Sequence, residues 1–312
     1  MGNRASEDNE VFKLEDGDEV SVGLNLPEST EELNLMASVA EYPQSYWLEP
    51  DGIEKALVRN SQQRHKHDRK KRRRRMRHQW RIGKCNASSN CSALEQLREV
   101  QGMPDVALSD CHLYTKLCGG QDRGSSLISS FREVQAGGVS PMEVQVGGMT
   151  EMLPNQAFRQ RDFSRGQWAA AQAAADQNRG LEYYKAPSNF KDFCVAVASA
   201  IARQHPIIFA WHVGSNSMRL RNGYAITARG RGNHSNVFHS GKWVGGSELV
   251  HPDNQNSWGP CSNNLYGKTG GNGWGEGGFA LFTMEQAFAC TKYHHTYICP
   301  SIKADAMDPA LQ

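Results

Sequence analysis

The sequence contains no run of about 18 consecutive apolar residues, which is the length that a membrane-spanning helix requires. Its first residues also lack the apolar core of a secretory signal peptide. Hydrophobic residues make up only 38% of the 312 residues, and the first 78 residues are the most polar part. We therefore expect no transmembrane segment, and a core that is built mainly from the later part of the chain.

The eight cysteines lack the regular spacing of a disulfide framework or of a zinc motif. In a reducing compartment most of them are expected to be small buried apolar residues. His65 and His67 lie close together, but no second pair of ligands follows at the spacing of a zinc site. We therefore predict neither a metal nor a cofactor.

Charge is distributed unevenly, although the net charge is only +2. The first thirty-odd residues are acidic, and the run from Arg64 to Arg77 is strongly basic. No aromatic side chain interrupts this run, so it lacks platforms on which bases could stack. Two interpretations stay open, a solvated linker and a tether to an anionic partner such as nucleic acid or an acidic surface. Met1 to Ser6 also match the short myristoylation pattern, for which an ordinary disordered start is the alternative.

Hydrophobic periodicity predicts helices in the first half of the body and strands in the second. Helices are expected directly after Cys85, at 125–134, at 167–177 and at 190–203. A buried strand is expected at 206–211, then short strands at 224–227, 236–238, 242–244, 278–283 and 296–299. Residues 136–165 are expected to be irregular. Residues 1–45 are expected to be mostly disordered, with a short helix at 31–40, and the apolar residues at 47–57 to dock on the body.

Two distant segments carry side chains that suit acyl transfer. Cys85 stands directly before a helical pattern, and Gln79 lies six positions ahead of it. Far downstream, the sequence Asn-Ser-Trp-Gly begins at Asn256, and His234 lies between the two segments. A thiolate can attack a carbonyl, an imidazole can move the proton, and an amide can orient the imidazole or stabilise an oxyanion.

Three motifs resemble those of the papain-like cysteine peptidases, and they occur in the family's order. They are Gln79 with Gly83-Lys84-Cys85 and Glu95, then Leu108-Ser109 with Cys118-Gly119-Gly120, and finally Asn256-Ser257-Trp258-Gly259 with the string Gly-Trp-Gly-Glu-Gly-Gly-Phe at 273–279. The last is the most specific of the three. The resemblance covers about residues 78–285.

This resemblance implies an α+β, papain-like two-lobed fold, in which a helical lobe is followed by a β-barrel-like lobe and a peptide binds in the cleft between them. It also implies a polar amino-terminal extension that could be a prosegment. The expected divisions are an acidic and polar extension at 1–63, a basic linker at 64–78, a helical lobe at 79–165, a β-rich lobe at 166–297 and a tail at 298–312.

The resemblance also implies a role for each candidate side chain. Cys85 would be the nucleophile that forms an acyl-enzyme, and His234 would pair with the thiolate and protonate the leaving amine. Asn256 would hold the imidazole in the required tautomer. Gln79 would donate its side-chain N–H to the oxyanion.

Two rivals remain beside these assignments. Cys91 lies inside the helical pattern, where its sulfur should face packing. His239 is closer than His234 to the family's usual distance from the Asn, but His234 follows a Gly-Asn turn and opens a predicted strand. We therefore prefer His234 and keep His239 open.

The sequence departs from the family at Ile82, where the family has a Cys, and at Asn86, where it has an aromatic residue. The first change removes the family's usual disulfide, and the second bears on substrate packing. These departures resemble a bacterial or phage-type branch. The lack of a signal-peptide core predicts a cytoplasmic or virion-associated protein. Three functions stay open: a cysteine endopeptidase, an inactive papain-like module in a larger, for example viral, assembly, and a thiol amidase that cleaves cell-wall peptides.

Overall fold

The structure is a computed structural model, and it describes residues 11–13, 19–25, 29–64, 77–218, 220–228, 230, 232–258, 278–291 and 296–303. The myristoylation pattern, His65 and His67, nearly all of the basic run, most of the string at 273–279 and most of the tail lie outside the described residues. Within the described residues, no helix combines the length and the apolar character that crossing a bilayer requires.

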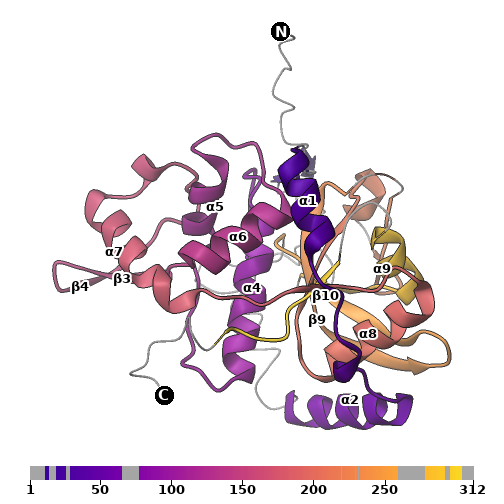
Figure 1. The fold of residues 1–312 in the computed structure, drawn as a ribbon. Helices are drawn as coiled ribbons and strands as arrows, with labels where there is room; N and C mark the ends of the chain where they lie inside the picture. Colours follow the sequence, from indigo (N-terminus) through magenta and orange to yellow (C-terminus); the bar gives the residue numbers. More distant parts are fainter. Residues whose placement is uncertain are drawn as a thin grey trace.

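Helices dominate the first part of the body, on the left in Figure 1. They are α4 (Cys85–Val100), α5 (Asp110–Cys118), α6 (Leu127–Gly137), η2 (Gln160–Asp162), α7 (Arg165–Ala175) and η3 (Asp176–Asn178), and a hairpin of β3 (Glu143–Val146) and β4 (Met149–Met152) lies among them. Side-chain caps begin α5, α6 and α7, at Ser109, Ser126 and Ser164 respectively. α4, α5 and α6 enclose one hydrophobic core, which includes Leu97, Leu113 and Phe131.

An eight-stranded sheet and its helices form the second part. In chain order they are β5 (Tyr184–Lys185), α8 (Phe190–Ala202), β6 (Ile207–Trp211), η4 (Ser215–Met218), β7 (Leu220–Arg221), β8 (Tyr224–Ala225), β9 (His234–Gly245), β10 (Leu249–Gln255), β11 (Phe279–Leu281), α9 (Met284–Thr291) and β12 (Tyr297–Ile298). The strand order is β5-β12-β6-β9-β10-β11-β8-β7, and β9 pairs antiparallel with both β6 and β10.

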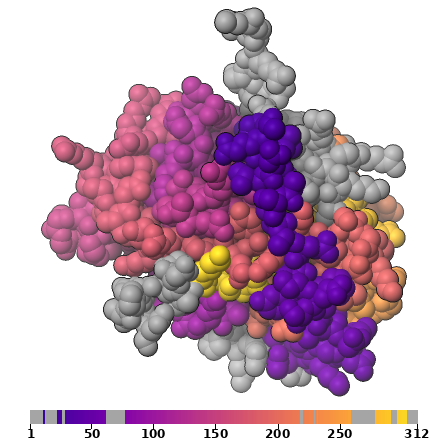
Figure 2. Space-filling view, viewed as in Figure 1, coloured from indigo at the N-terminus to yellow at the C-terminus, as the bar shows by residue number. Residues whose placement is uncertain are grey.

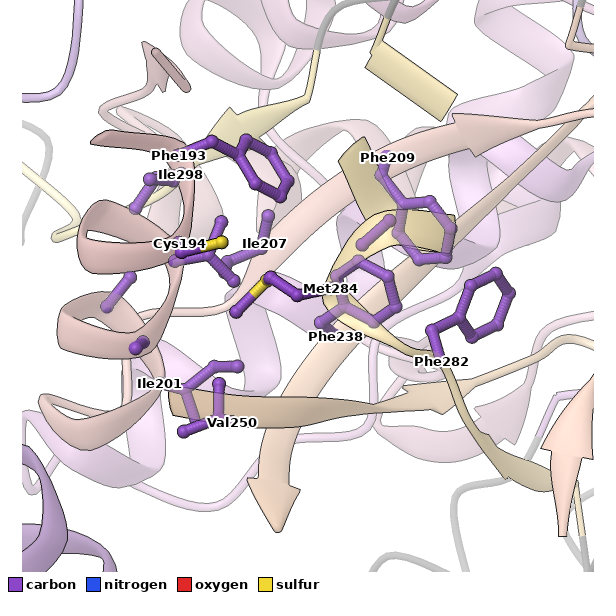
Figure 3. Packing of buried hydrophobic residues seen from close by; sticks show 14 of the residues in the cluster. Phe193, Cys194, Ile201, Ile207, Phe209, Phe238, Val250, Phe282, Met284 and Ile298 are labelled. Carbon is purple, nitrogen blue, oxygen red and sulfur yellow. The ribbon is translucent and has the colours of Figure 1, made fainter. Parts of the chain in front are cut away.

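One face of this sheet is covered by α8 and α9. Figure 3 shows Phe193, Cys194 and Ile201 of α8 packed with Phe209, Phe238 and other side chains of the sheet. The rings of Phe209 and Phe238 stack with centroids 3.8 Å apart. Because these side chains are fully buried, the central strands β6 and β9 are fixed in place, and β9 begins at His234.

The expected α+β, two-lobed class is confirmed, and the predicted helices agree closely with α6, α7 and α8. Among the described residues the sheet does not close on itself into a barrel.

The short strands predicted at 236–238 and 242–244 are one strand, β9, because Gly241 lets the backbone approach the carbonyl of His251. Residues 136–165 are only partly irregular, since they include the β3–β4 hairpin, whose turn is formed by Gly147 and Gly148, with φ of 58° and 84°.

The amino-terminal part is also folded where it is described. It contains β1 (Val11–Lys13), β2 (Glu19–Ser21), α1 (Thr30–Ser38), η1 (Gln44–Tyr46) and α2 (Pro50–Arg64), and Figure 2 shows it, in indigo, running over the surface from top to bottom. Ile53 and Leu57 of α2 enter the core beside α8, which confirms the expected docking of 47–57. The expected short helix at 31–40 is confirmed as α1. The expectation of disorder is wrong for residues 11–13, 19–25 and 39–45, because the body supplies the apolar surface that this segment lacks by itself.

Candidate active site

Cys85 is the first residue of α4, and its side chain is fully buried. Ser89, one turn later, donates its hydroxyl to the Cys85 carbonyl, and its oxygen lies 3.2 Å from the hydroxyl of Ser235 on β9. The start of α4 therefore lies against the start of β9. Burial raises the pKa of the Cys85 thiol to about 11, although backbone N–H groups of Ser235 and Gly23 act in the opposite direction.

His234 opens β9 and contacts two residues of the downstream motif. Its Nε2 lies 2.9 Å from Oδ1 of Asn256, and its ring stacks on Trp258 with centroids 4.2 Å apart. The backbone N–H of Ser257 also donates to this Asn256 oxygen, at 2.7 Å, and so keeps it turned toward the ring. His234 is fully buried, and burial lowers its pKa to about 3, even though the hydrogen bond with Asn256 raises it.

The two motifs that are distant in sequence meet through their backbones. His78 and Trp258 form an antiparallel bridge, and the N–H of Gln79 donates to the carbonyl of Ser257 at 2.9 Å. The hydroxyl of Ser257 donates to Oε1 of Gln79, so the amide Nε2 faces the turn before Cys85, where it donates to the carbonyl of Ile82 at 3.3 Å. The structure thus brings all four predicted side chains to one interface.

Electrostatically, this site is in an uncharged arrangement. Nδ1 of His234 is buried and makes no hydrogen bond, and none of the hydrogen bonds between described residues joins the ring to the Cys85 thiol. A neutral thiol and a neutral imidazole are what burial favours. The geometry can support thiol chemistry only after Cys85 gains access to a substrate.

The two rival residues are placed elsewhere. His239 lies on β9 with its Nε2 3.7 Å from Asp253, and the amide of Asn256 contacts His234 instead. Cys91 is fully buried in the helical core, where burial keeps its pKa well above the usual value. In the described part of the chain, no cluster of three metal-binding side chains exists.

Residues 22–25, which we call the strap, cross the site between its two sides. The N–H of Leu24 donates to the carbonyl of Asn233, and the carbonyl of Gly23 accepts from the N–H of Ser125 at 2.9 Å. Leu24 and Ser125 form a parallel bridge. Val22 packs into the core of the sheet and Leu24 into the core that contains Cys85. A Cβ on Gly23 would lie 2.2 Å from Cα of Gly83, so only glycine fits there.

Lys84, directly before Cys85, has a fully buried ammonium group. Its Nζ lies 3.0 Å from Oδ1 of Asp110, 3.2 Å from the sulfur of Cys111 and 2.9 Å from the carbonyl of Asn155. Burial opposes the charge, but Asp110 and Cys111 outweigh burial and raise the pKa of Lys84. A buried ion pair therefore ties the turn before Cys85 to α5.

Arg77 extends this ionic cluster. Its guanidinium is buried and donates to Glu95 at 2.6 Å and to the carbonyl of Leu108 at 3.0 Å. Glu95 also accepts from the N–H of Leu108. Arg77 is therefore held inside the protein and is not part of a surface that could bind an anion, which corrects the expectation for the last residue of the basic run.

Sequence reasoning missed the strap, the Lys84–Asp110 pair and the backbone of Ser125. Only the ion pair had a visible signal, because Lys84 and Asp110 each lie beside a motif residue. Gly23 and Ser125 act through their backbone atoms, which leave no signal in a side-chain pattern.

Solved structures of cysteine proteases are similar to this fold. Xylellain, a cysteine protease from Xylella fastidiosa, superposes with a TM-score of 0.52 at 18% identity, over 73% of this chain and 83% of that one. Digestive procathepsin L 3 of Tenebrio molitor larval midgut gives 0.50 at 17% identity, over 72% of this chain and 65% of that one, which is less than two thirds of its length. No family model and no curated protein sequence matches the chain. The chain has the two-lobed fold of the papain-like cysteine peptidases.

Proposed function

We propose that this chain is a cysteine endopeptidase that cleaves peptide or protein substrates through an acyl-enzyme. The observation that carries the proposal is the pair of His234 and Asn256, 2.9 Å apart and stacked on Trp258, at the interface where α4 presents Cys85. In this proposal Asn256 orients the imidazole, and Trp258 keeps water away from their hydrogen bond.

Each chemical step would use one of these groups. The sulfur of Cys85 attacks the scissile carbonyl carbon, and its proton passes to His234. The oxygen that becomes negative is stabilised by the amide of Gln79 and by the N–H of Cys85 at the start of α4. His234 then gives the proton to the leaving amine. Water, from which His234 removes a proton, hydrolyses the thioester and frees Cys85.

The described arrangement would be a latent form of this enzyme. The strap pairs with Ser125 on one side and Asn233 on the other, so a substrate would have to displace it. Its backbone N–H at Gly23 faces the thiol, and the thiol and His234 are in their neutral forms. The extension at 1–63 would therefore act as a prosegment, and the basic linker at 64–78 would be the place where it is cut.

Selective alkylation tests the peptidase proposal. The full chain is treated with iodoacetamide at pH 6 before and after limited trypsin digestion, and labelled cysteines are mapped by mass spectrometry. Because Arg77 is buried in an ion pair, we expect the new amino terminus to fall at or before Arg77. Digestion should give fast labelling of Cys85 and turnover of a peptide substrate. Cys85→Ala should abolish both, and His234→Ala should slow the labelling.

A second candidate is an inactive binding module with the same fold. The observation that favours it is the buried, uncharged state of Cys85 and His234. A digested chain that stays folded but labels Cys85 no faster than Cys91 or Cys118, and turns over no peptide, would support this candidate and refute the first.

A further inference from the structure

The strap lies in a narrow passage beside Cys85, between the backbones of two glycines. On one side, a Cβ on Gly23 would lie 2.2 Å from Cα of Gly83. On the other side, a Cβ on Gly124 would lie 2.2 Å from the carbonyl oxygen of Gly23. The backbone N–H of Gly23 faces the Cys85 thiol. Neither wall carries a side chain, and still the passage has no room for a Cβ on the residue inside it.

A chain of three hydrogen bonds joins the two walls. The N–H of Gly83 donates to Oδ1 of Asp122 at 2.9 Å, and the hydroxyl of Tyr114 donates to the same oxygen at 2.6 Å. The Tyr114 oxygen accepts the N–H of Gly124 at 2.9 Å. We call Tyr114 and Asp122 the brace. Because each link is a direct hydrogen bond and two of them involve a carboxylate, the brace holds the walls at a fixed separation.

The brace has a rigid support on one side. Tyr114 belongs to α5, and its side chain is fully buried in the core that also contains Leu113. Burial and the Asp122 carboxylate raise the pKa of Tyr114, so the phenol keeps its proton and can donate it to Asp122. A buried phenol that both donates and accepts cannot turn away without leaving a polar group unpaired. The width of the passage is therefore tied to the packing of α5.

Larger apolar residues flank the glycine of the strap. Val22 packs into the core of the sheet, and Leu24 packs into the core that contains Cys85. The strap thus places an apolar side chain on either side of the passage and none inside it. A chain that replaced the strap would meet the same walls and the same apolar surroundings.

We propose that Tyr114 and Asp122 are positioning residues that set the width of this passage, so that only a glycine can occupy it, in the strap and in a substrate alike. The substrate class is then peptides in which a glycine lies between two larger apolar residues. This inference deepens the proposed function, and only the substrate class rests on it. The width of the passage can be tested in the full-length chain without any turnover.

A double-mutant cycle on the full-length protein measures the width through iodoacetamide labelling of Cys85 at pH 7.5. Gly23→Ala should displace the strap and increase the labelling rate about 5- to 150-fold. Tyr114→Phe removes only the hydroxyl, so the walls can move apart, and the same Gly23→Ala change should then have a factor at least about twofold smaller. Tyr184→Phe, which removes a phenol bonded to Glu182 at 2.7 Å on β5, is the matched control and should leave the factor unchanged.

Equal factors for Gly23→Ala in the wild type and in Tyr114→Phe would overturn the proposal, because a general loosening of the fold raises both labelling rates alike. A second pair of variants tests the other half of the brace. Asp122→Asn keeps one acceptor oxygen and should preserve the wild-type factor, whereas Asp122→Ala removes the acceptor and should lower it. A wild-type factor in Asp122→Ala would equally overturn the proposal, and this variant leaves the Tyr114 side chain in the core.

The substrate class is tested on the digested enzyme with two peptides that differ only at their centre, Leu-Gly-Leu and Leu-Ala-Leu, whose order is the same in both directions. We expect kcat/KM to be higher for the glycine peptide by about 5- to 150-fold, and Tyr114→Phe to lower this ratio. A ratio near one in an active enzyme would refute the glycine requirement for substrates. Cleavage of neither peptide, with Cys85 unreactive, would refute the proposed function instead, and the labelling cycle would still decide the width.

Discussion

The backbone N–H of Leu24 donates to the carbonyl of Asn233 at 3.0 Å, and Asn233 directly precedes His234. On its other side the strap is hydrogen-bonded to Ser125, which lies just before α6. Residues near the start of the chain are thus fixed to both sides of the candidate site. Access to Cys85 should therefore depend on contacts that involve no catalytic side chain.

Substitution of Gly23 should expose Cys85. In Gly23→Val the added Cβ would lie 2.2 Å from Cα of Gly83, so the strap cannot keep its position. Overpacking of this kind costs about 1–3 kcal/mol, which would increase the open population, and with it the rate of Cys85 alkylation, roughly 5- to 150-fold. Gly52→Ala is the matched control, because the nearest atom to its Cβ would be 3.8 Å away. Equal rates in the two variants would show that the strap does not protect the thiol.

Gln79→Ala should separate oxyanion stabilisation from thiol reactivity. Removal of one oxyanion donor in another protease lowers kcat by about 10²- to 10³-fold, and we expect a similar loss in the digested enzyme. Alkylation of Cys85 forms no oxyanion, so its rate should stay within about twofold of the wild type. Ser257→Ala, which removes only the hydroxyl that donates to Gln79, should cause a smaller loss of kcat. A parallel loss of alkylation in Gln79→Ala would mean that the residue acts only on the fold.

Lys84→Met should destabilise the protein by up to about 3–5 kcal/mol, because it removes the cation 3.0 Å from the buried Asp110 carboxylate and leaves Arg77, at 3.7 Å, as the remaining charge beside it. Denaturant unfolding measures this loss. Arg179→Ala provides the comparison, since the Arg179–Asp176 pair is exposed and should contribute only about 0–1 kcal/mol. The double variant Lys84→Met, Asp110→Asn should regain part of the stability. If Lys84→Met costs no more than Arg179→Ala, the buried pair does not support the turn before Cys85.

Acidification should destabilise the fold through three buried histidines. Burial lowers the pKa of His112 and His234 to about 3 and that of His205 to about 4, from an ordinary value of 6.5. Because the folded pKa values are the lower ones, their contribution to stability is complete above pH 6.5 and decreases as the pH falls toward 4. Each histidine should account for about 1.4 kcal/mol per pH unit in this window.

Unfolding free energies between pH 7.5 and 4.5 test this dependence. His234→Gln should decrease the slope by the contribution of one proton, or about 1.4 kcal/mol per pH unit. An unchanged slope would show that His234 titrates in the folded state as it does in the unfolded chain.

Side-chain motifs found the centre of the site because its chemistry needs particular residue types. Gln79, Cys85 and Asn256 each lie beside a sequence feature that separates them from other residues of the same type. Examples are the helical pattern after Cys85 and the Trp after Asn256. The choice between His234 and His239 remained open, since both lie on a strand at similar separations from Asn256. The pairing of β9 with β6 and β10 decides which ring meets the amide.

In the amino-terminal extension, by contrast, the sequence did not predict the contacts with the body. Its acidic composition and weak periodicity predicted disorder, yet α1 is attached to α6 by contacts of Glu31 with Arg132 and of Glu32 with Ser126. Each contact depends on a surface that exists only after the body has folded. Local sequence therefore predicted the helix at 31–40, which is α1, but not the surface to which it is attached.

The sequence by itself determined the class of fold and the choice of the candidate reactive groups, because hydrophobic periodicity and the chemistry of thiol, imidazole and amide are properties of short segments. The tertiary structure alone decided that Gly23 covers Cys85, that Lys84 pairs with Asp110 inside the protein, and that Tyr114 and Asp122 join Gly83 to Gly124. These relationships join positions that are far apart in the chain or that act through backbone atoms. They arise only when packing brings the elements together and removes water from between them.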